Sequence, residues 1–266
     1  MTKHALFISL VILIAYSCVK RESNPRVLTV YPTSDTLPEN LLRLYIQFSE
    51  PMKTTENLDK IKLLDERGQE VKGAIFNNVH ELWDSDQKQL TILFDPARVK
   101  SDLQANKSMG RALAPGMTYE LMITDLETIK HKKIMPYTKK IHVIAADTIS
   151  PNTIKWNLNL PKADGTAPLN ISFADRVDQM SLRQRLVIVD ENENRIEGDI
   201  RIGNYEKEWS FIPNKNWKPG HYAVYVHARL EDPSGNNLNG LFDHRSGSLK
   251  YETEDEVLKL PFSIEE

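Results

Sequence analysis

The chain has 266 residues, with 34 Lys and Arg against 37 Asp and Glu and a net charge of −3. This balance is typical of a globular protein and argues against a broad basic surface for nucleic acid. Cys18 is the only cysteine, which excludes an internal disulfide framework and a thiolate-rich metal site within one chain.

The N-terminal segment is apolar. Residues 5–16 follow a weakly basic start and are almost wholly hydrophobic. These 12 residues are fewer than the roughly 20 that a membrane-spanning helix needs. They match the apolar core of a secretory signal peptide, which is about 7–15 residues long. We therefore predict a signal peptide over residues 1–17, with a buried N-terminal helix as the alternative.

The apolar segment ends in Ala15-Tyr16-Ser17-Cys18. This resembles the lipobox of bacterial lipoproteins, except for the bulky Tyr16. The resemblance implies that Cys18 becomes the N-terminus and carries lipid such as palmitate. The mature chain would then keep 249 residues, with residues 18–26 as a short tether. No acidic residue directly follows Cys18, and by the same resemblance this implies the outer membrane, at its periplasmic face or surface.

The rest of the chain contains an internal repeat with an offset of 125 residues. Residues 44–50 match 169–175, residues 61–66 match 186–191, and residues 71–73 match 196–198. A shared offset across three segments indicates duplication of one unit. We predict one unit over residues 27–146 and a second over residues 147–266.

Both units are rich in alternating apolar and polar residues. Leu44, Ile46 and Phe48 are expected on one face of a strand, with Tyr45 and Gln47 on the other. Further strands are predicted in the same way around residues 61–64, 90–94, 119–123, 141–143, 169–173, 186–189, 209–211, 222–226 and 258–264. Pro261 should place the last strand at a sheet edge or a bulge. The predicted fold is all-β, with two tandem Ig-like β-sandwiches.

Three motifs resemble bacterial Ig-like domains of the S-layer-protein (SbsA-type) class. They are Leu44-x-Ile-x-Phe-Ser-Glu-Pro-Met52 after Pro32, Leu113-Ala-Pro-Gly-Met-Thr-Tyr119, and Asp232-Pro-Ser-Gly-Asn-Asn-Leu238. The second unit lacks the Pro-Met of the first, and the first unit lacks the Gly-Asn loop of the second. The resemblance implies an adhesive, spacer or binding module rather than a catalyst.

Several patterns could indicate chemistry. Glu50 and Asp175 occupy equivalent positions and could form an acid/base pair, or each could accept backbone N–H groups in a loop. Residues 190–194 contain acidic and amide side chains and could bind calcium, but residues 65–69 align with them and indicate a hairpin turn. Residues 80–86 contain metal-capable types without a second histidine at ligand spacing. Because a nucleophile elbow and a phosphate-binding loop are also missing from the sequence, we expect no metal, no cofactor and no enzymatic activity.

The first unit has a longer connection between residues 96 and 115, with about 13 extra residues. Four cations lie in it against the single acid Asp102: Arg98, Lys100, Lys107 and Arg111. Long loops on a rigid scaffold often bind ligands, so these cations are the candidate site for a carboxylate or phosphate. The alternative is a covering segment over a sheet edge. Trp83 and Trp217, if they lie nearby, would favour recognition.

The sequence thus predicts a membrane-anchored lipoprotein of the cell envelope that acts as a non-catalytic binding or structural module. Its partners would be the membrane, through lipid on Cys18, and an unidentified envelope protein or glycan. One alternative is an envelope enzyme or carbohydrate-processing accessory with a site between the two units. The other is a mechanical spacer.

Overall fold

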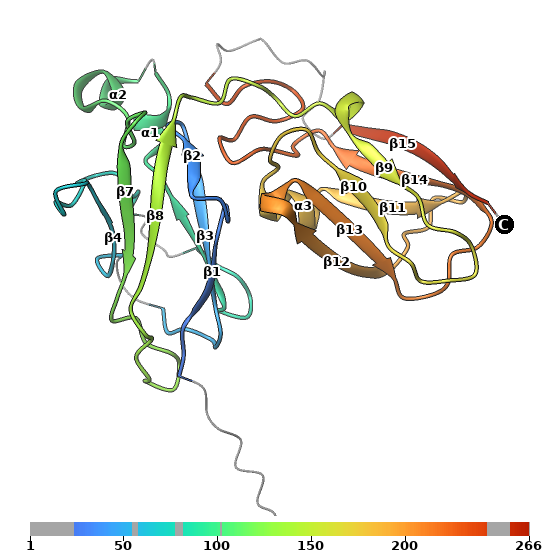
Figure 1. Cartoon of the computed structure of the whole chain (residues 1–266), viewed down its shortest axis with the longest axis horizontal. Coiled ribbons are helices and arrows are strands. Elements are labelled where there is room, and N and C mark those ends of the chain that lie inside the picture. Colours follow the sequence, from blue (N-terminus) through green and yellow to red (C-terminus); the bar gives the residue numbers. More distant parts are fainter. Residues whose placement is uncertain (1–23, 55–57, 78–81, 102, 244–255, 266) are drawn as a thin grey trace, which may run out of the picture.

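The fold is described from a computed structural model over residues 24–54, 58–77, 82–101, 103–243 and 256–265. The predicted signal peptide, Cys18, His80 and Asp102 lie outside these residues. Figure 1 shows two β-rich bodies side by side. We call strands β1 to β8 with their connections the first module, and strands β9 to β15 with theirs the second module.

The first module contains two four-stranded sheets. One has the order β1 (Val27–Tyr31), β3 (Arg43–Phe48), β6 (Gln89–Leu93) and β5 (Leu82–Trp83), and its pairings are antiparallel. The other has the order β2 (Thr36–Pro38), β8 (Tyr137–Ile144), β7 (Thr118–Ile123) and β4 (Ile61–Leu64), with β2 parallel to β8. Two short helices, α1 (Pro96–Val99) and α2 (Gln104–Met109), lie between β6 and β7.

The second module also contains two sheets, one with four strands and one with three. One sheet has the order β12 (Gly198–Gly203), β13 (Glu208–Pro213), β10 (Leu169–Ser172) and β9 (Asn157–Asn159). The other has the order β11 (Leu186–Asp190), β14 (Gly220–His227) and β15 (Val257–Ile264). The connections contain η1 (Thr153–Lys155), α3 (Gln179–Gln184) and η2 (Asn204–Glu206). Among the described residues, β2 is the one strand of the first module without a counterpart here.

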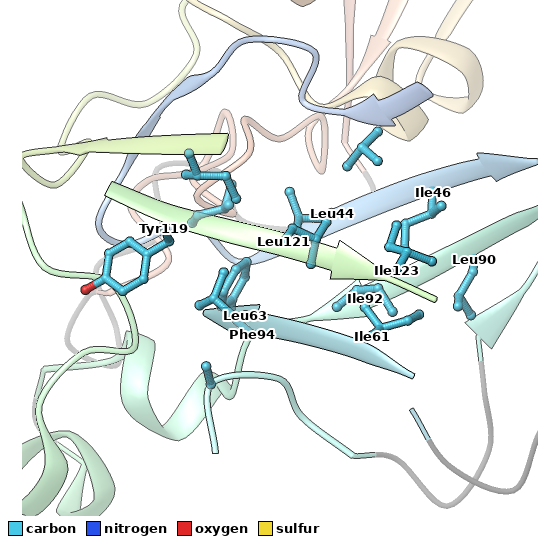
Figure 2. Close-up of a cluster of buried hydrophobic side chains, with 14 of the residues drawn as sticks. Leu44, Ile46, Ile61, Leu63, Leu90, Ile92, Phe94, Tyr119, Leu121 and Ile123 are labelled. Atoms are coloured by element: carbon cyan, nitrogen blue, oxygen red, sulfur yellow. The ribbon is translucent and has the colours of Figure 1, made fainter. Parts of the chain in front are cut away.

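Apolar alternation explains why these segments form sheets. Leu44, Ile46 and Phe48 of β3 are each at most 1% exposed and belong to one hydrophobic cluster. Figure 2 shows Leu44 and Ile46 beside the inward residues of β4, β6 and β7. Leu169 and Ile171 of β10, at the repeat offset, are equally buried in a second cluster. Each module therefore has its own hydrophobic core between two sheets, and the predicted all-β, Ig-like sandwich class is confirmed.

The turns at residues 65–69 and 190–194, which are equivalent in the repeat, are held by the same kind of hydrogen bond. The carboxylate of Asp65 accepts the N–H groups of Arg67 and Gln69 at 2.9 and 2.8 Å. Asp190 accepts those of Asn192 and Asn194, both at 2.9 Å. Such Asx-type bonds stabilise a turn, so residues 190–194 form the predicted hairpin turn.

The edge prediction for Pro261 is also confirmed. Among the residues that the structure describes, strand β15 lies at the end of its sheet and pairs only with β14, with Pro261 opposite Ala223. Proline lacks an N–H group, and an edge strand tolerates that loss.

Tyr45 lies on the face of β3 opposite Leu44, as alternation predicts, yet only 3% of it is exposed, because the second module covers that face. One expectation needs correction. The extra connection of the first module was expected to be a loop, yet it contains α1 and α2. In the described part of the chain, no helix is long and apolar enough to cross a membrane.

Candidate functional site at the junction of the two modules

The four predicted cations of residues 96–115 do not form one open site. Arg98 is buried on α1, where its guanidinium donates to three backbone carbonyls: those of Gly110, Lys72 and Arg111 at 2.9, 3.2 and 3.0 Å. The hydrogen bonds of Arg98 therefore stabilise the backbone conformation of the connection that contains α1 and α2. Lys107 is exposed on α2.

The other two cations face the second module. Lys100 places its ammonium group 4.5 Å from the centre of the Phe242 ring, which is cation–π geometry. Arg111 forms ion pairs with Glu39 at 3.2 Å and with Asp243 at 3.6 Å. The Ser101 N–H also approaches both carboxylate oxygens of Asp243 at 3.2 Å. The carboxylates that pair with this basic segment thus belong to the same chain. The sequence analysis did not predict these contacts.

Phe242 and Asp243 lie at the end of residues 232–243, a segment of the second module that contacts the first. We call this segment the junction loop. Phe242 packs against the hydrophobic core of the first module although it follows β14 of the second. The Leu42 N–H donates to the Pro233 carbonyl at 3.0 Å. The junction loop therefore supplies both backbone and apolar contacts to the first module.

Gly235 allows this close approach. Its φ angle is +80°, and a Cβ atom at this position would lie 2.7 Å from Cδ2 of Leu42. Both the left-handed backbone and the contact favour glycine. The loop is further held by Asp232, whose carboxylate accepts the N–H groups of Ser234 and Asn236 at 2.8 and 3.0 Å. The Gly-Asn motif, which the sequence shows in the second unit only, is thus an inter-module contact.

A second part of the junction is a buried charged cluster. The Tyr45 hydroxyl donates to Asp178 at 2.8 Å, and Arg43 forms an ion pair with Glu231 at 2.6 Å. Tyr45 and Arg43 come from β3, whereas Asp178 is the N-cap of α3 and also accepts the Ser181 N–H at 2.9 Å. Both pairs cross between modules, and they lie on the β3 face that alternation predicted to be polar.

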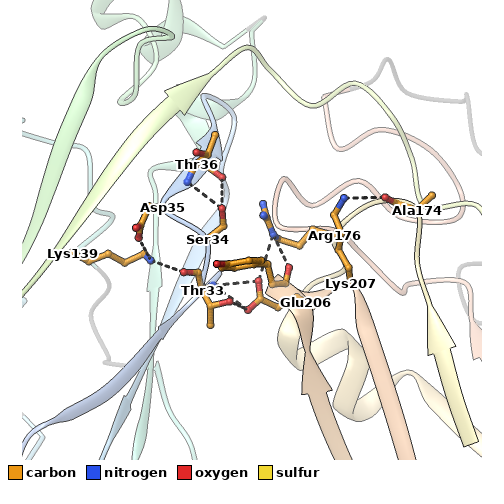
Figure 3. A network of polar contacts seen from close by, with 10 residues as sticks. Thr33, Ser34, Asp35, Thr36, Lys139, Ala174, Arg176, Glu206 and Lys207 are labelled. Atoms are coloured by element: carbon orange, nitrogen blue, oxygen red, sulfur yellow. Dashed lines mark hydrogen bonds and ion pairs between the residues drawn. The ribbon is translucent and has the colours of Figure 1, made fainter.

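A third part of the junction centres on Glu206 (Figure 3). The N–H and hydroxyl of Thr33 donate to one Glu206 oxygen at 3.0 and 2.7 Å, and Arg176 approaches the other at 3.5 Å. Lys139 donates to the Thr33 carbonyl and to Asp35, both at 3.1 Å. Glu206 is only 2% exposed, so its charge is matched almost entirely by protein groups.

The backbone that presents Glu206 is unusual. Asn204, Tyr205 and Glu206 have φ angles of 45°, 55° and 62°, all in the left-handed region. Each such non-glycine residue costs about 1–2 kcal/mol. The surrounding contacts must offset this cost, and the hydrogen bonds from Thr33 are contacts that do so.

Burial changes the acidity of the junction carboxyls. Desolvation raises the pKa of Asp178, Glu206 and Glu231, although Arg43 opposes the rise at Asp178 and Glu231. Desolvation and the neighbouring Asp147 raise the pKa of Asp232 to about 8. The pKa of Tyr45 is raised by burial and by Asp178. These groups therefore keep their protons to a higher pH in the folded chain than they would in water.

Three hollows of the described surface bear on the choice of site. A cavity of about 20 Å³ beside residues 149–152, which we call the linker, is lined by Trp156, Asp175 and Arg176. This is room for about one water molecule. Two open hollows of about 370 and 400 Å³ lie near Tyr222 and Tyr119, next to equivalent turns of the two modules. A feature that occurs in both copies belongs to the scaffold.

The other predicted site residues are placed as follows. Glu50 lies beside Pro51 in the first module, whereas Asp175 lines the linker cavity of the second. Trp83 packs against Phe48 with ring centres 5.6 Å apart, and Trp217 is buried in the second core. Neither tryptophan is an exposed recognition group. Across the described ranges, no group of three His, Cys, Asp or Glu could hold a metal ion.

The fold and the junction define an all-β Ig-like sandwich protein. No family model matches the chain, and no curated protein matches it in sequence. The S-layer protein rSbsC(31-844) is 12% identical with a TM-score of 0.33, and the match covers 77% of this chain and 23% of that one. This chain thus spans about a quarter of the length of that S-layer chain.

Two further solved structures match this chain. Alpha-2-macroglobulin from Escherichia coli, over domains MG0-NIE-MG1, is 13% identical with a TM-score of 0.29, covering 91% of this chain and 72% of that one. SGBP-B of the Bacteroides ovatus mixed-linkage glucan utilization locus, in complex with a heptasaccharide, is 14% identical with a TM-score of 0.23, covering 77% and 44%. These similarities concern the fold.

Proposed function

We propose that the chain is a lipid-anchored, non-catalytic protein of the bacterial cell envelope whose two modules act as one rigid unit. The observation that carries this proposal is the junction, where charged side chains from one module are paired with polar side chains of the other. The rigid unit would hold a partner, an envelope protein or a glycan, in a fixed place relative to the membrane. Neither a nucleic acid nor a cofactor has a role in it.

The energetics of the junction support rigidity. Removing a carboxylate from water is unfavourable unless hydrogen bonds or opposite charges replace its hydration. Glu206 and Asp178 each have one partner in their own module, Arg176 and the Ser181 N–H group. They keep the donors of Thr33 and Tyr45 only while the modules are in contact, since those two residues belong to the first module. Partial sliding would leave these carboxylates desolvated with fewer hydrogen-bond donors, so a graded hinge motion is disfavoured.

The N-terminal sequence supports the lipid anchor. A lipobox-like segment places the only cysteine of the chain directly after an apolar core. Acyl chains bind a bilayer through their buried methylene groups, and two or more signals give stable attachment.

The proposal is tested by measuring the distance between modules in the lipidated protein. Spin labels at Met109→Cys and Ile154→Cys would report on the first and second modules, because both side chains are more than half exposed. We expect a single narrow distance distribution. A broad distribution would contradict the rigid unit. Labelled palmitate should be incorporated into the wild type and not into a Cys18→Ala variant, and incorporation by both would contradict the anchor.

A mechanical spacer without a partner is the second candidate, because the same rigid junction suits it. The two functions differ in binding. The immobilised mature protein should retain one defined envelope component that a Cys18→Ala variant of the same fold also retains. If nothing is retained above an empty matrix, the spacer is favoured.

A further inference from the structure

One end of the first module carries a projecting hairpin, residues 125–136, which joins β7 to β8. In Figure 1 this hairpin lies beside the start of β1 and reaches beyond the sheets. The Met135 N–H donates to the Pro25 carbonyl at 3.0 Å, and the Ile129 N–H donates to the Pro51 carbonyl at 3.1 Å. The hairpin is thus fixed next to the point where the N-terminal segment leaves the fold. The helices α1 and α2 lie at the other end of the module (Figure 1).

Three large apolar side chains are exposed at this end. Ile129 is 51% exposed, Met135 53% and Leu28 52%. Leu28 projects because the register between β1 and β3 shifts at Val27 and Thr29, which leaves it as an extra residue. Several exposed large apolar side chains at one projecting end favour an interaction surface there.

The tip of the hairpin is basic. Residues 128–136 contain Lys130, His131, Lys132 and Lys133 and no acidic residue. The two acids of the incoming strand already have partners in the hairpin: Asp125 pairs with Lys133 at 3.0 Å, and Glu127 approaches His131 at 3.8 Å. The neighbouring turn carries Asp84 and Asp86, so the basic character belongs to the hairpin and not to the whole end of the module.

We propose that this hairpin docks on the surface of a membrane that contains anionic lipids. The inference rests on the proposed lipid on Cys18. Asn24, where the described fold begins, follows Cys18 by six residues, and an extended chain of that length reaches about 20 Å. The end of the module that carries the hairpin is therefore held within that distance of the bilayer.

Docking uses two kinds of contact. Ile129 and Met135 enter the boundary between headgroups and acyl chains, while Lys130 at the tip of the hairpin faces lipid phosphates. The hairpin is too short to bind a membrane strongly by itself. Linked to a lipid, it experiences a high effective concentration of membrane, so a small affinity is enough to fix its orientation.

The experiment uses the lipidated full-length mature protein on vesicles of phosphatidylethanolamine and phosphatidylglycerol. An environment-sensitive fluorophore is placed at Met135→Cys, or at Met109→Cys on α2 as the matched control, since both methionines are more than half exposed. We expect the label at position 135 to shift to shorter wavelength and to be quenched by nitroxide-bearing lipid. The label at position 109 should do neither.

A second pair of variants tests the contact itself. Ile129→Asp should return the label at position 135 to its emission in water, whereas the same change at Ile154, which is 90% exposed in the second module, should leave it shifted. Raising the salt to about 1 M, where the Debye length falls to about 3 Å, should reduce the shift.

The outcomes separate the two proposals. If the protein floats with the vesicles but the label at position 135 is quenched no more than that at position 109, docking is overturned and the anchor stands. If the protein neither floats nor incorporates palmitate, the anchor itself is wrong, and docking falls with it.

Discussion

Tyr45 shows how a single side chain can belong to a sheet and to a junction at once. Alternation along β3 places it opposite Leu44 and Ile46, where a half-buried aromatic residue facing water would be ordinary. Instead its hydroxyl donates to Asp178, which lies 133 residues later in the chain. The period of the strand predicts the face correctly but carries no information about what covers that face.

The Tyr45–Asp178 bond gives the first prediction. In Tyr45→Phe the buried Asp178 carboxylate loses a donor, so the free energy of unfolding should fall by about 1–3 kcal/mol. Urea denaturation measures the change. Tyr225→Phe is the matched control, because the Tyr225 hydroxyl donates to Glu193 at an exposed position. That control should change the free energy of unfolding by less than about 0.5 kcal/mol. Equal losses in both variants would show that the buried hydrogen bond contributes no more to stability than the exposed one.

Glu206 could not be predicted to lie in the junction. It follows Asn204 and Tyr205 without a glycine to mark the left-handed backbone, and its donor Thr33 comes from the opposite end of the sequence. By contrast, the turn at Asp190 was predictable, because Asp65 repeats it at the offset of 125 residues and both turns are closed by local bonds.

At the scale of elements, the basic segment and the junction loop are the parts where prediction was incomplete. The surplus of cations near α1 and α2 predicted a site for a carboxylate or phosphate ligand, whereas Arg111 pairs with a carboxylate of the same chain. Its partner, Asp243, lies more than 130 residues from Arg111, so no local pattern connects them. A usable signal was present in the Gly235-Asn236 motif, since its occurrence in one unit alone set it apart from the repeated scaffold.

Gly235 gives the second prediction. In Gly235→Ala the new methyl group would collide with Leu42 in addition to straining the backbone. Gly68→Ala is the control, because its φ of +71° is similar and nothing lies within 4 Å of its Cβ position. The control should lose about 1–2 kcal/mol of unfolding free energy, and Gly235→Ala should lose clearly more, as measured by urea denaturation.

A double variant tests the cause of that difference. Shortening the neighbour in Leu42→Ala should make the added cost of Gly235→Ala smaller than in the wild type, because the contact is removed. If the cost of Gly235→Ala is the same in both backgrounds, steric contact with Leu42 is not its source.

The whole molecule should respond to pH through its junction. Asp178, Glu206, Glu231 and Asp232 all have raised pKa values in the folded chain. Between the pKa of the unfolded chain, about 4, and the raised value, the folded state holds more protons than the unfolded state. Unfolding then releases protons, so the free energy of unfolding should fall as the pH rises from 5 to 8.

Denaturation by urea at pH 5, 6, 7 and 8 measures this dependence. For Asp232 the window extends from 3.8 to about 8, so the decrease should continue through neutral pH. Glu231→Gln removes one titrating group while keeping an oxygen that can accept from Arg43, and it should make the slope shallower. Stability that stays level or increases with pH would contradict the expected protonation of the junction.

The exposed edge of β15 has a consequence for many copies of the protein held on one surface. Anchored molecules meet one another often, and an open strand edge can template a β-sheet between neighbours. In the first module β2 occupies the corresponding edge of β8. In the second module Pro261 lies within β15, and a strand added there would find no N–H group at that position. Lys259, two residues earlier, places a charged side chain on the same strand, where it lies 3.8 Å from Glu193. With the proposed lipid anchor, copies of the protein crowded on a bilayer would therefore have a lower tendency to polymerise through β15.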